Sequence, residues 1–407
     1  MTSLKEAFNP HSNSIGFLRW FLAFAVIFSH AGPLAGFYGG HDLGTQFSTE
    51  QSFGGVAVAG FFFLSGYLIT KSRMGRSSTI RYFWRRIMRI FPAWLLVLIL
   101  TAYVLAPIAW NQEHGSMDGF WDARTDSPFT YFTNNMWLPL VQHNIAGMGK
   151  IIPFYTLNGG FEWNGSAWTL GFEFRAYIIV GVLGMVGALS KNRMVGTFIA
   201  FGLIALAMMQ WFGFGALTNL APIFGDYRFL LLMAPFAFGM LFALHDDKVM
   251  IDNRLAILCA FIAVWTYGKG GWLVFGQYAF CYVIMWIAIN VRFLRNWDKH
   301  GDFSYGIYIV AWPLMQFAAY FKLQDAGWLV YHIVIVAACH AYAYFSWLLI
   351  ERPALQLKDW TPRWGSWLLV RTQDLRLRIF GVIDPSFPER SMARAQKAIP
   401  RVAGGAR

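Results

Sequence analysis

The sequence predicts an all-α membrane protein, a polytopic transmembrane helix bundle of about ten spans with both termini cytoplasmic. The first observation is composition, because 57% of the 407 residues are hydrophobic and only 13% are charged, with a mean hydropathy of +0.44. Soluble domains carry about 25% charged residues. The second observation is a series of long apolar runs, and the third is the placement of basic residues between them. The net charge of +12 therefore indicates membrane topology rather than a nucleic-acid partner.

The apolar runs are the candidate membrane spans, since a spanning helix needs about 20 mostly apolar residues. Ten runs qualify, and the seventh of them is short. They occupy residues 16–37, 54–71, 91–110, 167–189, 194–213, 228–245, 253–267, 271–290, 303–321 and 328–350.

The basic residues between the runs predict the orientation of the chain, because cytoplasmic loops of membrane proteins carry an excess of Lys and Arg. One side receives the loop 71–90, three short basic turns and the basic tail; the loop alone holds Lys71, Arg73, Arg76, Arg81, Arg85, Arg86 and Arg89. The other side receives few basic residues, which are Arg124, Lys150, Lys269 and Lys322, with Arg228 at an edge. Both termini are therefore expected in the cytoplasm.

This topology divides the chain into three parts. Residues 1–15 form a cytoplasmic N-terminal segment, 16–351 the membrane domain, and 352–407 a basic cytoplasmic tail that could lie on the membrane surface. Within the membrane domain, residues 111–166 are an extracytoplasmic loop, and loops of this length are often functional. The three cysteines show no metal-binding spacing, so no metal cofactor is expected, and no secretory signal is evident.

The first predicted span carries Arg19 and His30, which lie eleven residues apart and so share one helix face about 16 Å apart along the axis. His30 then lies about two-thirds of the way across the membrane, where ionisable side chains usually face a protein interior or a watery cavity. Two plainer interpretations remain, because Arg19 could extend to the headgroups and His30 could cap a neighbouring helix. A buried imidazole can also exchange protons near neutral pH.

Glu173 lies about five residues inside the fourth predicted span, in the stretch "GSAWTLGFEFRAY". Counting depth from the outer surface places it at about the level of His30, as a His–carboxylate pair requires. The alternative is that Glu173 pairs with Arg175 or Arg19 instead. The sequence leaves both interpretations open.

Two further stretches carry candidate binding residues. Arg86 and Arg89, in "RYFWRRIMRIFPAW", are three residues apart and share a helix face, where guanidinium groups suit phosphate oxygens or lipid headgroups. The span "GGVAVAGFFFLSGYLIT" is rich in small residues, which allow close approach of another backbone or of a thin ligand. Its Ser65 could bond to a ligand or to its own helix backbone.

Taken in order, these motifs resemble those of the acyltransferase 3 family of integral-membrane O-acyltransferases, over most of residues 15–353. The resemblance rests on the Arg19–His30 spacing, "FFFLSGYLIT", "RRIMRIFPAW", "WTLGFEFRAY", "FSYGIYIVAWP" and "IERP". It implies acyl transfer from cytoplasmic acyl-CoA, acetyl-CoA above all, to a hydroxyl of an exported glycan or similar acceptor, in the cytoplasmic membrane of a bacterium. It also implies catalytic roles for His30, Arg19 and Glu173, and donor binding by Arg86 and Arg89, to which we add Ser65.

The chain departs from the family pattern at two points. A histidine often precedes the Trp-Pro of the "SYGIYLIHWP"-like segment, and here that position is Ala311. Many relatives carry an appended extracytoplasmic esterase-like domain, for which the short tail has no room. The protein is therefore expected to transfer the group directly or to pass it to a separate extracytoplasmic protein.

The predicted mechanism places the donor's phosphates on Arg86 and Arg89, while the pantetheine arm follows the small-residue helix faces toward His30. His30 would act as the general base, with Glu173 stabilising the imidazolium. The loop 111–166 is expected to contact the acceptor through polar and aromatic side chains, which are His114, Asp118, Trp121, Asp122, Asp126 and His143. Intramembrane His, Arg and Glu also suit a proton-coupled transporter, and a non-catalytic partner in a glycan assembly complex is a third possibility.

Overall fold

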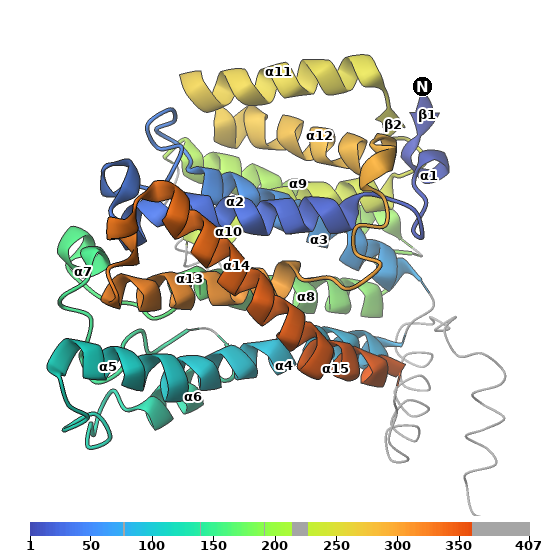
Figure 1. Cartoon of the computed structure of the whole chain (residues 1–407). Coiled ribbons are helices and arrows are strands. Elements are labelled where there is room, and N and C mark those ends of the chain that lie inside the picture. The colour runs from blue at the N-terminus through green and yellow to red at the C-terminus, as the bar shows by residue number, and fades with distance from the viewer. Residues whose placement is uncertain (76–77, 139, 191, 214–226, 360–407) are drawn as a thin grey trace, which may run out of the picture.

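The computed structural model describes residues 1–75, 78–138, 140–190, 192–213 and 227–359, which form a bundle of helices lying side by side (Figure 1). The first half contains β1 (Thr2–Ser3), α1 (Leu4–Ala7), α2 (Ile15–Ala35), η1 (Phe37–Gly40), α3 (Phe53–Met74), α4 (Thr79–Leu100), η2 (Thr101–Leu105), α5 (Ala106–His114), α6 (Pro128–Asn135), α7 (Pro153–Asn158), η3 (Gly165–Ala167) and α8 (Trp168–Met185). The second half contains α9 (Arg193–Trp211), α10 (Tyr227–Leu244), β2 (Met250–Ile251), α11 (Asn253–Lys269), η5 (Trp272–Gly276), α12 (Gln277–Asn290), η6 (Arg292–Leu294), α13 (Ser304–Tyr320), η7 (Leu323–Ala326), α14 (Trp328–Ser346), η8 (Trp347–Glu351), α15 (Arg352–Gln356) and η9 (Leu357–Asp359).

Each of the ten predicted spans coincides with a helix. Within the described ranges, seven helical segments are long and apolar enough to cross a membrane: Ile15–Ala35, Phe53–Met74, Thr79–His114, Gly165–Met185, Arg193–Trp211, Trp272–Asn290 and Trp328–Gln356. The other three, α10, α11 and α13, are 17 or 18 residues long. The prediction of an all-α polytopic bundle is confirmed.

The segment predicted as a basic loop at 71–90 is instead mostly helical. The helix α3 continues to Met74, and α4 already begins at Thr79, where the hydroxyl of Ser78 caps it by accepting a hydrogen bond from the Arg81 N–H. With η2 and α5 this helix runs to His114 over 36 residues, about 54 Å, which exceeds the hydrocarbon core of about 30 Å. Hydropathy alone detected only its apolar part, because the first turns are basic.

A small residue of α3, Gly66, lets this helix pack closely on α10. A Cβ added at Gly66 would lie 2.0 Å from the backbone oxygen of Phe236 on α10, and one at Gly239 would lie 2.2 Å from the backbone oxygen of Phe63. The two backbones therefore cross in direct contact, as small residues permit. At Gly66 the neighbouring helix therefore occupies the space beside α3, whereas Ser65 lines a cavity on another face of the same helix, so the path of the pantetheine arm stays a prediction.

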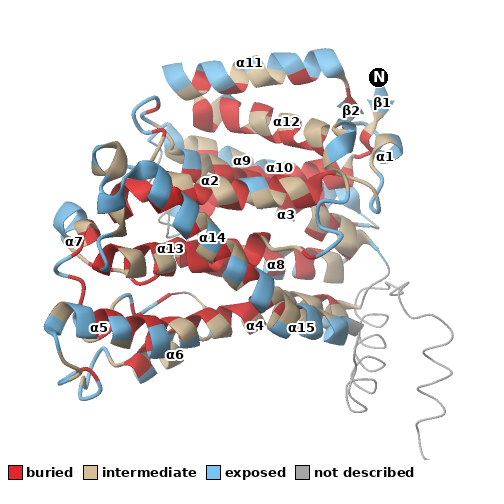
Figure 2. Ribbon diagram, viewed as in Figure 1, coloured by how far each residue is buried: buried red, intermediate tan, exposed pale blue. Residues whose placement is uncertain are grey.

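The outward faces of the bundle are apolar. Figure 2 shows exposed residues along α11 and α14, at the outside of the bundle. Large hydrophobic side chains are exposed there, including Phe261 and Trp265 on α11 and Ile333 on α14. Such surfaces suit contact with lipid tails, as expected for a protein embedded in a membrane.

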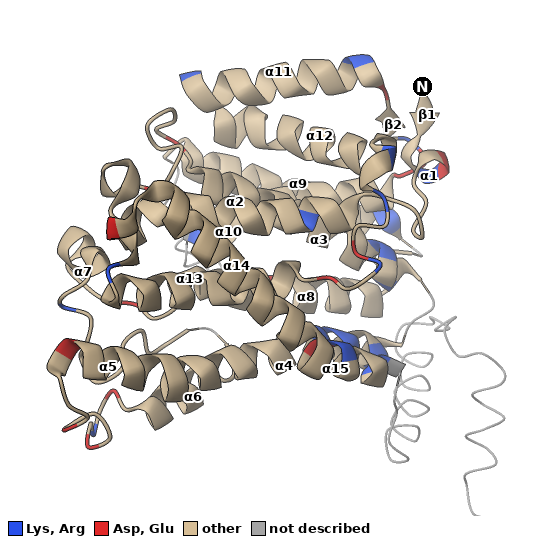
Figure 3. Cartoon of the chain, viewed as in Figure 1, with Lys and Arg blue, Asp and Glu red and all other residues tan. Residues whose placement is uncertain are grey.

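Basic side chains gather at one end of the bundle (Figure 3), where α1, the first turns of α4 and α15 lie. The strand β1 pairs antiparallel with β2, Thr2 opposite Ile251, and this pairing fastens the N-terminal segment to the same end. Of the predicted tail, residues 352–359 form α15 and η9, and residues 360–407 lie outside the described ranges. We call this end, marked by Lys71, Arg86 and Lys358, the basic end.

The stretch 111–166 is a packed layer rather than an open loop. It contains the short helices α6 and α7, and its Phe120, Tyr131 and Trp163 are completely buried. This layer covers the end of the bundle opposite the basic end, on the left in Figure 1.

Candidate active site

A cavity of about 440 Å³ lies inside the bundle, within the range of small-molecule sites. It extends from Leu355 and Lys358 at the basic end to Thr169 and Tyr308 in the interior, between α2, α3, α4, α8 and α13. One face of α3 forms a wall, because lining residues recur there at helical spacing. The polar residues that line it are Arg19, Ser65, Arg85, Arg86, Arg89, Thr169, Glu173, Tyr177, Ser304, Tyr305, Tyr308 and Lys358.

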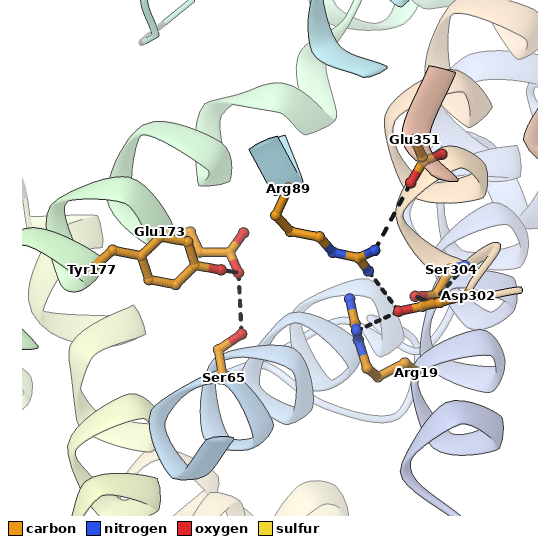
Figure 4. A network of polar contacts seen from close by, with 8 residues as sticks. All are labelled: Arg19, Ser65, Arg89, Glu173, Tyr177, Asp302, Ser304 and Glu351. Carbon is orange, nitrogen blue, oxygen red and sulfur yellow. Dashed lines mark hydrogen bonds and ion pairs between the residues drawn. The ribbon is translucent and has the colours of Figure 1, made fainter. Parts of the chain in front are cut away.

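Asp302, in the connection before α13, joins two of the cavity's arginines (Figure 4). Its Oδ2 accepts hydrogen bonds from Arg19 Nη1 and Arg89 Nη2, each at 2.5 Å, and its Oδ1 accepts from the Ser304 N–H at 3.2 Å and hydroxyl at 2.5 Å. Arg89 Nη1 also faces Glu351 Oε2 at 4.0 Å. Burial raises the pKa of Asp302, but Arg19 and Arg89 outweigh burial and hold that pKa well below its usual range. Asp302 is therefore a carboxylate shared by two guanidinium groups.

Arg86 has a different environment, although it lies only one turn from Arg89. Its guanidinium carbon lies 5.8 Å from the ring centre of Tyr82 and 5.7 Å from that of Tyr177. Among the described residues, no carboxylate forms an ion pair with it. Cation–π contact with a ring face leaves the in-plane N–H groups of a guanidinium able to bind an anion. Arg86 is therefore the arginine best placed to bind an external phosphate.

Glu173 lies deeper in the cavity and holds two hydroxyl groups. Its Oε1 accepts a hydrogen bond from Ser65 Oγ at 3.1 Å and one from the Tyr177 hydroxyl at 2.5 Å (Figure 4). Ser65 thus bonds to Glu173 rather than to its own helix backbone, and Arg175 is exposed against the ring of Phe172. The cluster places a carboxylate and two potential nucleophiles in one apolar-walled chamber.

His30 pairs with a different carboxylate from the one predicted. Its Nδ1 lies 2.8 Å from Asp42 Oδ1, which also accepts a hydrogen bond from Ser29 Oγ at 3.0 Å. The His30 ring packs edge-on against Trp312, with ring centres 4.9 Å apart. In the tautomer in which Nδ1 donates to Asp42, Nε2 is the ring nitrogen that can accept a proton.

The predicted pairing of His30 with Glu173 is therefore wrong, and the reason is depth. Gly165 and His30 both pack on the ring of Trp312, so the two residues lie at about the same depth along the bundle. Glu173 follows eight residues later, about 12 Å further along the helix. The depth predicted from sequence assumes that the fourth span starts at the membrane surface, whereas α8 already begins at the depth of His30.

The structure brings together five of the six predicted site residues, since Arg19, Ser65, Arg86, Arg89 and Glu173 all line the cavity. His30 lies beyond its inner end. Val58 and Thr169 line that end of the cavity. Val58 follows Gly54 by four residues and Thr169 follows Gly165 by four residues, and both glycines lie at the level of His30. The gap is therefore about 6 Å.

Sequence reasoning missed Asp42, Asp302, Glu351 and Tyr177. Tyr177 was accessible to it, because it follows Glu173 by four residues and so shares its helix face. Asp42 and Asp302 lie in connections without a periodic pattern, so no sequence signal indicates their partners. Glu351 lies in η8, a π-helical turn that shifts the register of its side chains.

The outer layer carries a second histidine–carboxylate pair. His143 Nδ1 lies 3.5 Å from Glu162 Oε2, and the hydrogen bond to Glu162 raises the pKa of His143 above its ordinary value. The backbone oxygen of Glu162 accepts hydrogen bonds from Trp312 Nε1 at 3.0 Å and Gln316 Nε2 at 2.9 Å. This part of the layer is thereby attached to the ring that contacts His30.

Three other predicted loop residues have only local contacts. His114 stacks on Trp110, Asp118 bonds to Ser116, and Trp121 is exposed. In the part of the chain that the structure describes, no three His, Cys, Asp or Glu side chains gather in a way that could hold a metal ion.

The structure is that of a helical membrane bundle with an internal cavity lined by charged groups, and comparison with known proteins gives its family. Residues 12–351 match the sequence model of the family described as "Acyltransferase domain", and the chain belongs to this family, acyltransferase 3. It is therefore a membrane acyltransferase.

Three relatives illustrate the family. The chain is 26% identical to a protein named O-acetyl transferase from Shigella phage Sf6, covering 84% of this chain and 95% of the relative. It is 25% identical to Nodulation protein 10 of Rhizobium leguminosarum bv. viciae, covering 87% and 96%. It is 27% identical to Acyltransferase MdmB of Streptomyces mycarofaciens, over 40% of this chain and 36% of that protein. No solved structure matches the chain.

Proposed function

We propose that the protein transfers an acyl group from cytoplasmic acyl-CoA to a hydroxyl of an extracytoplasmic glycan or related acceptor, in the inner membrane of a bacterium. The observation that carries the proposal is the cavity, which begins among basic residues and contains a half-buried carboxylate, Glu173, with two hydroxyls bonded to it. The likeness to a protein named O-acetyl transferase favours acetyl as the group and acetyl-CoA as the donor.

The donor enters from the basic end. Coenzyme A carries several phosphate charges that cannot cross the membrane core, whereas its pantetheine arm is thin and uncharged. Arg86, which lacks a carboxylate partner among the described residues, binds a phosphate, and the arm extends along the α3 wall toward Ser65. Arg89 and Arg19 lie further inside and are held in place by their hydrogen bonds to Asp302.

The acceptor arrives from the opposite side, where His30 is the general base. Its Nε2 takes the proton of the acceptor hydroxyl while the hydroxyl oxygen attacks the thioester carbonyl, the carbon–sulfur bond breaks, and coenzyme A leaves as a thiolate that is then protonated. Asp42 holds the imidazole through Nδ1 and stabilises its charged form. A side-chain movement must close the gap of about 6 Å between the inner end of the cavity and His30.

Glu173 acts within the donor chamber instead of on His30. It orients the hydroxyls of Ser65 and Tyr177, which can hydrogen bond to the thioester or receive the acyl group before it passes to the acceptor. On the acceptor side, the pair His143–Glu162 is the part of segment 111–166 attached to Trp312, and we assign it to acceptor contact. A separate extracytoplasmic transferase would receive the group at the same face.

Thioester consumption by the purified protein tests this function. In lipid nanodiscs, the protein should release free thiol from acetyl-CoA when a suitable glycan or sugar acceptor is present, and the acceptor should gain an acetyl ester detectable by mass spectrometry. A protein without thiol release for any acceptor, yet with proton-coupled flux of a solute in vesicles, would instead be a transporter. Loss of cell-envelope acetylation in a strain lacking the gene, without thiol release in vitro, would indicate a non-catalytic partner.

A further inference from the structure

Three of the arginines that line the cavity, Arg19, Arg86 and Arg89, form two tiers. Arg86 lies nearer the start of α4 than Arg89, which follows three residues later and about 4.5 Å further from the basic end. Lys358, which is exposed, lines the same outer part as Arg86. Arg89 and Arg19 form the inner tier, at the level where both contact Asp302.

The two tiers differ in their charge partners. Both inner guanidinium groups lie 2.5 Å from one oxygen of Asp302, and Arg89 has Glu351 as a second carboxylate at 4.0 Å (Figure 4). Arg86 in the outer tier has two aromatic rings instead of a carboxylate. Carboxylates thus balance the positive charge in the interior, whereas the positive charge nearer the basic end can bind an external anion.

This difference matters because two adjacent guanidinium groups are a strong site for phosphate. Without Asp302, Arg19 and Arg89 would be such a site beside the chamber of Ser65 and Glu173. A phosphate group bound there would occupy the space that the uncharged arm of the donor needs.

We propose that Asp302 masks Arg19 and Arg89, so that the cavity binds phosphate in its outer part, at Arg86, and admits only uncharged groups further in. The proposal rests on the proposed function for its biological meaning, since it explains how a polyanionic donor stops at the right depth. The masking itself concerns only anion binding, so it can be measured without acyl transfer.

Calorimetric titration of the purified protein with inorganic pyrophosphate tests the masking. Asp302→Asn keeps the side-chain shape but removes the charge, and it should tighten pyrophosphate binding about 10- to 100-fold, the change expected for a gained charge-assisted hydrogen bond. Asp246→Asn is the matched control, because Asp246 pairs with Lys71 at 2.5 Å at the same end of the bundle but does not line the cavity. It should leave pyrophosphate affinity within about twofold.

A second variant keeps the test decisive if Asp302→Asn does not fold. With Asp302 intact, Arg86→Ala should weaken pyrophosphate binding at least tenfold, because the inner arginines are not available to replace Arg86. Unchanged binding in Arg86→Ala, or unchanged or weaker binding in folded Asp302→Asn, would overturn the masking. Acetyl-CoA consumption by the unmodified protein is measured separately, so a failure of the proposed function is distinguishable from a failure of this inference.

Discussion

At the residue scale, the site consists of charged groups whose partners decide their roles. His30 and Asp42 form one pair, Glu173 holds Ser65 and Tyr177, and Asp302 holds two arginines. The sequence indicated the chemistry-bearing residues themselves, because intramembrane charges are rare and stand out. It did not indicate their partners, since those lie in connections between helices or depend on the relative depth of two helices.

His30→Ala should reduce acetyl transfer by about 10²- to 10⁴-fold while donor binding survives, because general acid–base catalysis contributes about that much. Asp42→Asn should lower kcat by a smaller factor and leave the donor KM unchanged, because the imidazole stays but loses its stabilising charge. Thiol release and donor titration measure the two effects. Near-normal turnover of a stably expressed His30→Ala protein would exclude His30 as the base and make Glu173 or a hydroxyl nucleophile the next candidate.

Alanine substitutions of Arg86 and Arg89 should have different effects, one on donor binding and the other on stability. Arg86→Ala should weaken acetyl-CoA binding about 10- to 150-fold with little change in stability, because it removes a charge-assisted phosphate contact of about 1.5–3 kcal/mol. Arg89→Ala should instead destabilise the protein, by up to about 3–5 kcal/mol, because Asp302 keeps only Arg19 and the buried Glu351 loses its guanidinium neighbour. Donor titration and thermal unfolding in detergent report the two quantities. Equal stability of both variants would show that Arg89 does not secure the fold.

At the scale of elements, contacts between backbones set the positions of the cavity walls. The helix α3 packs on α10 through Gly66 and Gly239 and turns its opposite face to the cavity. The sequence predicted this helix and its small residues, but it could not distinguish packing from a ligand path. Only the position of the neighbouring helix decides between them.

Gly66→Ala should destabilise the bundle by about 1–3 kcal/mol or more, because the added methyl group would lie 2.0 Å from the Phe236 backbone oxygen and one helix must shift. Gly202→Ala on α9 is the control. No atom lies within 4 Å of a Cβ at that position, so alanine there should be neutral or stabilising by up to about 1 kcal/mol. Thermal unfolding in one detergent compares the two, and similar melting temperatures would contradict the close crossing of α3 and α10.

The outer layer should respond to pH through His143. Its pKa is raised in the folded protein, so the pair with Glu162 contributes stability that is fully present below the unfolded pKa of about 6.5 and is lost as pH rises through the folded value. Because His143 is half-exposed, the effect is small. Proteolysis of the layer should be faster in His143→Ala than in the unmodified protein at pH 5.5 and equal at pH 8.5. A difference of the same size at both pH values would assign the effect to packing.

At the scale of the whole molecule, the charge distribution predicts orientation. Asp122→Cys in the outer layer should react with a membrane-impermeant thiol reagent in cells whose outer barrier has been opened, and His11→Cys at the basic end should not. Both positions are exposed, and a Cys259→Ala background removes the one partly exposed natural cysteine. The reverse pattern would place the basic end outside and overturn the proposed direction of transfer.

The fold as a whole was readable from the sequence for a physical reason. Lipid requires long apolar helices, and each of these leaves a run visible in composition. The lateral order of the helices leaves no such trace, so the cavity between α2, α3, α4, α8 and α13 was not predictable. The extra turns of α4 were missed because basic residues extend that helix beyond its apolar run.

Trp312 has a consequence for engineering this enzyme. The indole ring of Trp312 makes a T-shaped contact with the His30 ring and packs against Gly165. Its Nε1 also donates a hydrogen bond to the backbone carbonyl of Glu162, in segment 111–166. A segment 111–166 transplanted from a relative would therefore also change the contacts that hold the His30 ring. Grafts that keep the fold should be those that reproduce a carbonyl at the position of Glu162 and an aromatic ring at the position of Phe154 against Trp312.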